Sequence, residues 1–105
     1  MLELDKNNFG PEVLESTGAI MVDFWGQSCE PCKALMPHIL ALEEKYGDKI
    51  TFASFDIAKG RRVAMSQGVA GLPAIYIYKD GVMVEDLRGD AATATAVEEL
   101  IQRHI

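Results

Sequence analysis

Cysteine is scarce in this sequence, whose 105 residues contain only Cys29 and Cys32, three positions apart. A chain of this length with 49% hydrophobic residues can bury a core without metals or a disulfide framework, so the two cysteines are not needed as staples. Their spacing leaves three interpretations: half of a zinc site, two inert cysteines, or a redox-active pair.

Long apolar runs and low-complexity segments are missing too. No linker or repeat interrupts the chain, which predicts one domain over residues 1–105. No apolar run approaches the ~20 residues of a spanning helix, and no basic stretch leads into an apolar segment as in a signal peptide. We therefore expect a cytoplasmic protein with no membrane partner. Cytoplasmic thiols are kept reduced, which favours a redox-active or metal-binding pair over a structural disulfide.

Positive charge and histidine are also in short supply. Ten basic residues face sixteen acidic ones, and the net charge of −6 argues against nucleic acid or an anionic membrane as partner. The partner is expected to be another protein. The two histidines, His38 and His104, lie far apart in sequence, so a zinc site would lack a second pair of ligands. We expect neither a metal nor a cofactor.

The hydrophobic pattern predicts a buried strand followed by a long helix. The run "AIMVDFW" (19–25) has the length and composition of a strand buried on both faces, with Asp23 as its one acid. Apolar residues recur at helical spacing over 30–46, and Gly47 supplies a stop. Pro31 suits the first turn of that helix.

Shorter elements complete the pattern. Strands are expected at 2–4, 50–57, 74–79 and 82–87, the last two joined by an Asp80-Gly81 turn. Short helices are expected after the Asn7-Asn8 cap candidates, at 61–67, and after Asp90, which can cap a last helix. That helix carries on one face Val97, Leu100, Ile101 and His104. The order βαβαβαββα predicts an α/β fold with a mixed sheet flanked by helices.

This order places the cysteine pair where a buried strand ends and a helix begins. Unpaired N–H groups and the helix dipole at that point favour a thiolate on Cys29. Cys32, one turn further, is placed to attack a mixed disulfide on Cys29 and is partly shielded by the helix. Pro31 pre-organises the turn between them. The position at a helix start disfavours two inert cysteines.

Two segments, "VDFWGQSCEPCKALMP" and "GLPAIYIYKDGVMVEDLRG", resemble the thioredoxin family, and the resemblance extends over nearly the whole chain. It implies a thioredoxin fold, a dithiol–disulfide site at Cys29 and Cys32, and a cis proline at Pro73 facing it. By the same resemblance, Cys29 is the attacking nucleophile, Cys32 the resolving thiol, and Asp23 the buried carboxylate that handles the proton of Cys32. The implied substrate surface comprises Trp25, Ser28, Glu30, Pro31, Gly71, Leu72, Pro73 and Gly89.

The chain departs from the family pattern at three positions. Ser28 replaces an aromatic residue before the first cysteine, Glu30 replaces the glycine between the cysteines, and Ser54 replaces the lysine that usually partners the buried acid. Asp23 is thereby left without a counter-ion, and we expect burial to raise its pKa.

The function expected from these features is that of a monomeric protein-disulfide reductase. It would act on disulfide-containing target proteins and be re-reduced by a separate reductase of the thioredoxin-reductase type. Two alternatives stay open. An oxidant or isomerase of the same fold would require secretion, and a non-enzymatic binding module of this fold would not need its cysteines.

Overall fold

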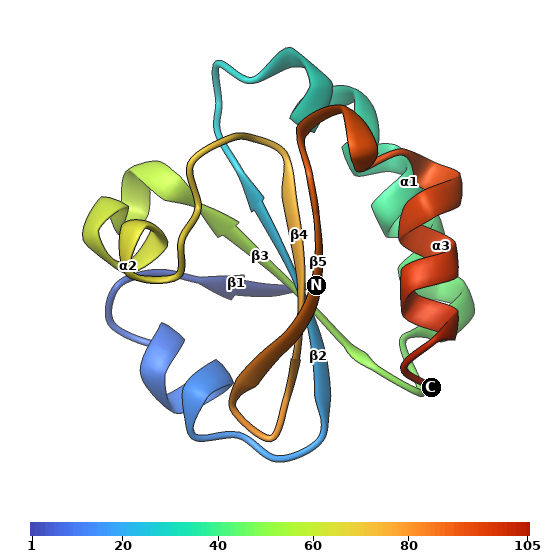
Figure 1. Ribbon diagram of the computed structural model, residues 1–105, viewed down its shortest axis with the longest axis horizontal. Helices are drawn as coiled ribbons and strands as arrows, with labels where there is room; N and C mark the ends of the chain where they lie inside the picture. Colours follow the sequence, from blue (N-terminus) through green and yellow to red (C-terminus); the bar gives the residue numbers. More distant parts are fainter.

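A five-stranded sheet with helices on both faces forms the body of the molecule, as the computed structural model of residues 1–105 shows (Figure 1). The strands are β1 (Leu2–Leu4), β2 (Ala19–Trp25), β3 (Thr51–Asp56), β4 (Ala74–Lys79) and β5 (Val82–Arg88). The helices are α1 (Glu30–Tyr46), α2 (Arg61–Ser66) and α3 (Ala94–Gln102), with short turns η1 (Gly10–Leu14), η2 (Ile57–Lys59) and η3 (Gly89–Ala91). The predicted order of strands and main helices is confirmed.

The strand order β1-β3-β2-β4-β5 places β2 at the centre of the sheet. β2 and β1 both run parallel to β3, whereas β4 is antiparallel to β2 and to β5. The parallel pairing of β2 with β3 brings Trp25 beside Asp56, where both strands end. Residues that follow these two strands therefore meet at the same end of the sheet.

Two hydrophobic clusters cover the faces of the sheet. One lies under α1 and α3 and the other under η1 and α2, which occupy opposite sides in Figure 1. Residues of β2 alternate between them, since Met21 belongs to the first cluster and Val22 and Phe24 belong to the second. By this alternation Asp23 shares the α1 and α3 face with Met21.

The helix starts differ from the sequence predictions. Asp90 lies in η3, and Thr93 caps α3 instead, accepting the Ala96 N–H at 3.1 Å. The asparagine cap of the first helix was also wrong, because Asn8 accepts the Asp5 N–H at 2.7 Å and η1, a π-helical turn, has no side-chain cap. Thr93 and Asn8 each accept the free N–H that the turn of the chain brings within reach.

His104 lies beyond α3, not on it, and its Nε2 is 2.8 Å from a carboxylate oxygen of Glu85. The predicted hairpin is confirmed: Asp80 and Gly81 both have positive φ, at 51° and 83°. Asp80 also accepts the N–H of Gly18 at 2.8 Å. No helix combines the length and the apolar character needed to cross a membrane.

Candidate active site

Cys29 is the N-cap of α1, and it forms a disulfide with Cys32 across a Cα–Cα distance of 5.3 Å. Its backbone is extended, and its sulfur accepts the Cys32 N–H at 3.2 Å. Pro31, in the first helical turn, has no N–H to leave unpaired. Cys32 is 1% exposed, whereas Cys29 is only partly buried. A partner molecule can therefore reach the first sulfur more readily than the second.

Asp23 lies on the central strand β2, two residues before Trp25. It is 1% exposed, flanked by Ser54 on β3 and Ile75 on β4, and neither of its carboxylate oxygens has a hydrogen-bond partner. Burial raises the pKa of Asp23 from an ordinary value of 3.8 to about 7. The expectation of a raised pKa is confirmed, and the group can exchange a proton near neutral pH.

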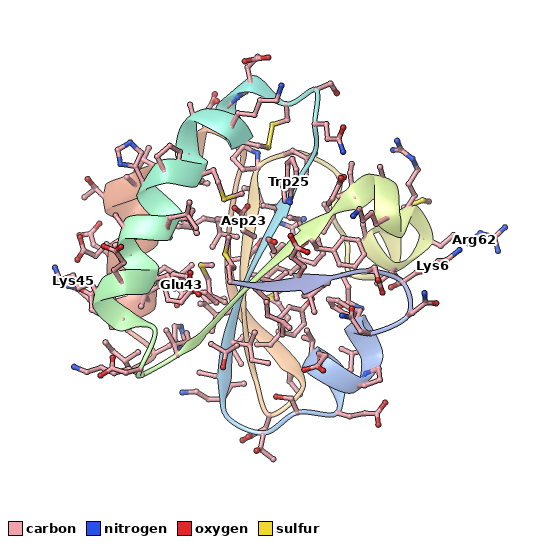
Figure 2. All side chains as sticks on the ribbon, turned by 180° about the vertical axis from the view of Figure 1, so that it is seen from behind. Lys6, Asp23, Trp25, Glu43, Lys45 and Arg62 are labelled. Atoms are coloured by element: carbon pink, nitrogen blue, oxygen red, sulfur yellow. A yellow bond between two sulfur atoms is a disulfide. The ribbon has the colours of Figure 1, made fainter.

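A hollow of about 690 Å³ opens beside the buried sulfur, between α1 and the edge of the sheet. It is lined by Trp25, Cys32 and Ser54, together with the charged side chains of Glu3 and Lys33. Ser54 is thus shared between the wall of the hollow and the surroundings of Asp23. Figure 2 shows the disulfide at the start of α1, with Trp25 and Asp23 below it on β2.

The segment before β4 lies against the loop that carries Cys29. The Leu72–Pro73 bond is cis, as the resemblance implied, and Pro73 accepts the N–H of Gly89 at 2.8 Å. Phe24 pairs with Ala74 in antiparallel strands, so Pro73, one residue before Ala74, lies opposite Trp25. A Cβ on Gly26 would lie 3.2 Å from Leu72 Cδ1, which shows how closely the two segments approach.

The other residues expected on the substrate surface differ in exposure. Ser28, Glu30, Pro31 and Gly71 are exposed, and Trp25, Leu72 and Gly89 are partly buried. Glu30 forms an exposed ion pair with Lys33, with N and O atoms 3.7 Å apart. That cation offsets part of the negative charge that Glu30 places beside Cys29.

Sequence reasoning missed a contact that holds the loop before Cys29. The side-chain amide of Gln27 donates to the Asp56 carboxylate at 3.0 Å, and the same carboxylate accepts the Ala58 N–H at 3.0 Å. An Asp at the end of a strand, two residues before a free N–H, is the signal of such a turn. The partner Gln27 carried no signal, because the contact depends on the pairing of β2 with β3.

Comparison with known proteins decides between the three interpretations of the cysteine pair. The family model "Thioredoxin" matches residues 1–103. The chain belongs to the thioredoxin family. It is 49% identical over 105 residues to "Thioredoxin" of Acetoanaerobium sticklandii, covering all of both chains. It is 42% identical to "Thioredoxin" of Peptoclostridium acidaminophilum, covering this whole chain and 96% of the relative, and 32% identical to that of Bacillus subtilis, covering 86% of each.

Family membership and the disulfide at the start of α1 together establish the chemistry of the site. The sheet and its helices form a thioredoxin fold, and the cysteine pair is redox-active. The protein is a thiol–disulfide oxidoreductase, which exchanges two electrons by interconverting the Cys29–Cys32 disulfide and dithiol.

Proposed function

We propose that this protein reduces disulfide bonds in other proteins, with Cys29 as nucleophile and Cys32 as resolving thiol. The observation that carries the proposal is the unequal exposure of the two sulfurs at the start of α1. A reductase of this kind works where thiols are kept reduced, which favours the cytoplasm. A separate reductase would return the pair to the dithiol, and the protein would act as a monomer of one domain, residues 1–105.

The reaction begins on the exposed sulfur. In the dithiol form, the thiolate of Cys29 attacks one sulfur of the target disulfide, and the other target sulfur leaves as a thiolate and takes up a proton. The helix start favours the negative charge on Cys29, and the Cys32 N–H that points at its sulfur adds to this effect. The product is a mixed disulfide between Cys29 and the target.

The second step uses the buried groups. The Cys32 thiol gives its proton to the Asp23 carboxylate, through water in the adjoining hollow, and its sulfur attacks Cys29. The mixed disulfide breaks and the Cys29–Cys32 disulfide forms. The second target sulfur leaves as a thiolate and takes up a proton, so the target is released as a dithiol. A carboxyl with a pKa of about 7 is ionised often enough at neutral pH to accept this proton.

The target chain would lie across the surface formed by the cis-proline segment and the Cys29 loop. Gly71 has no neighbour within 4 Å of the position of a Cβ, so it leaves backbone open beside Leu72 and Pro73. Trp25 and Gly89, which is bonded to Pro73, would border this surface, and the exposed residues Ser28, Glu30 and Pro31 would form its other side. Ser28 supplies less apolar contact area than an aromatic residue would.

Insulin reduction with dithiothreitol tests the proposal. The native protein should accelerate the turbidity that follows reduction, whereas Cys32→Ser should lose turnover and accumulate mixed disulfides with target proteins. A Cys29→Ser variant is the matched control and should trap nothing. Trapping by Cys29→Ser instead would reverse the two roles. Full binding of partners by a double Cys→Ser variant, without catalysis by the native protein, would favour a binding module.

A further inference from the structure

Four basic side chains gather around one hollow beside the redox site. Four of the ten lysines and arginines form ion pairs, which leaves six without a carboxylate partner. Four of those six line a hollow of about 400 Å³ that contains no acidic residue. We call them the basic cluster: Lys6, Lys59, Arg61 and Arg62. In a chain with a net charge of −6, this is a local reversal of sign.

The fold holds these cations together through the backbone. β1 and β3 are parallel neighbours, so Lys6, which follows β1, meets the segment that follows β3. The Lys6 N–H donates to the Lys59 carbonyl at 3.1 Å. A Cβ on Gly60 would lie 3.2 Å from Lys6 Cβ and 2.7 Å from the Phe55 ring, so this approach depends on glycine. Figure 2 shows Lys6 and Arg62 extending from the same side of the molecule.

The basic cluster borders the site where a partner's sulfur would react. Lys59 also lines a smaller hollow with Trp25 and Gln27, residues at the start of the Cys29 loop. Arg61 also lines an apolar hollow with Leu72, which precedes the cis proline. The cluster thus adjoins both the loop before Cys29 and the segment before the cis proline, and its charges act over about 8 to 10 Å at physiological ionic strength.

We infer that the basic cluster is a docking surface for an acidic patch on a redox partner protein, next to the partner's own disulfide or dithiol. The inference rests on the proposed function. All four side chains are exposed, and no buried polar side chain lines the hollow to enclose a small anion. Elsewhere the negative charge of this chain repels an acidic partner, so the cluster selects one orientation of approach.

The test compares two synthetic peptides with the same disulfide loop, one flanked by glutamates and one by lysines. At low ionic strength, the reduced protein should reduce the glutamate peptide about ten times faster, since electrostatic steering changes association rates by 10-fold or more. At about 1 M salt, where the screening length is about 3 Å, the two rate constants should converge.

Arg61→Gln/Arg62→Gln should abolish most of the preference and leave the maximal rate unchanged. Lys49→Gln/Lys79→Gln makes the same change in net charge with the other two unpaired cations. These lie at the opposite end of the sheet's strands, where Lys79 pairs with Ala19 and Lys49 precedes β3. This control should keep the preference. Equal rates for the two peptides, or equal effects of the two double variants, would overturn the inference.

A binding measurement separates this inference from the proposed function. A glutamate-rich peptide without cysteine should shift the amide resonances of residues 58–63 in the oxidised protein, and Arg61→Gln/Arg62→Gln should prevent the shift. No shift in the native protein would overturn the docking surface even if disulfide reduction proceeds. Tighter binding of inorganic phosphate than of the peptide would overturn it in favour of a small-anion site. If neither disulfide peptide is reduced, the proposed function fails, and this titration still decides the docking surface.

Discussion

The Asp23 carboxyl group is buried without a hydrogen-bond partner or a counter-ion, and this arrangement lowers stability when the group ionises. Its folded-state pKa of about 7 lies above the ordinary 3.8, so the folded protein holds the proton to higher pH than the unfolded chain does. Stability should therefore fall as pH rises from about 4 through about 7.

Replacing Asp23 by alanine should remove that loss. We expect Asp23→Ala to raise the free energy of unfolding at pH 7 by roughly 2 to 4 kcal/mol, with no gain below pH of about 4. The same variant should slow resolution of the mixed disulfide. Urea unfolding at several pH values measures the first effect, and single-turnover kinetics measure the second. A variant that is less stable than the native protein at pH 7 would contradict this account.

Glu30 lies beside the reactive sulfur, and its charge should make the pair more reducing by disfavouring the thiolate. Glu30→Gln should raise the reduction potential, on the order of 10 mV, with the Lys33 ion pair keeping the effect small. Equilibration with glutathione measures the potential. Glu44→Gln removes the same charge from an exposed position late in α1 and should leave the potential unchanged. A potential that moves equally in both variants would show a general charge effect.

The sequence predicted individual residues well where a single position conflicts with its surroundings. An acid inside an apolar strand marks Asp23, and two cysteines at a helix start mark the redox pair. The contact of Gln27 with Asp56 could not be predicted in this way, since it depends on two strands that are neighbours only in the folded sheet.

Among the elements, α3 depends on a cap that the sequence alone assigned to the wrong residue. Thr93→Ala should lower the free energy of unfolding by about 1 kcal/mol, because the Ala96 N–H loses its acceptor. Asp90→Ala should change it by less than about 0.5 kcal/mol, since Asp90 is exposed and caps nothing. Urea titration of both variants checks the pair. A larger loss of stability from Asp90→Ala than from Thr93→Ala would show that Asp90 is the cap, as the sequence predicted.

The difference between these two residues shows why element boundaries are harder to predict than elements. Apolar periodicity predicted the buried face of α3 through Val97, Leu100 and Ile101. The start of the helix depends instead on η3, a turn of three residues that leaves no periodic pattern. Both Asp90 and Thr93 have suitable side chains, and only the path of the backbone distinguishes them.

For the molecule as a whole, the two hydrophobic clusters share one sheet, and we expect them to unfold together. β2 contributes Met21 to one cluster and Phe24 to the other, so loss of either cluster exposes the same strand. Urea transitions followed by Trp25 fluorescence and by far-ultraviolet circular dichroism should coincide. Separate midpoints would show that residues 1–105 contain units that unfold independently.

The basic cluster was not foreseen because it exists only at the scale of the whole fold. Lys6 and Arg62 are far apart in sequence, and they share a hollow because β1 pairs with β3. Composition indicated an acidic chain and correctly described its average. The average conceals a cationic hollow formed by the segments that follow β1 and β3.

The central position of β2 determines when the redox site can unfold. Ladder hydrogen bonds to β3 and β4 hold this strand on both sides from Ile20 to Phe24. Its amide protons should exchange with deuterium only when the whole chain opens. Asp23 and Trp25 are part of this strand, and the loop to Cys29 continues from its end. Fluctuations that free the ends of the molecule should therefore leave the redox centre assembled, and heat should inactivate the protein only at the temperature at which it melts.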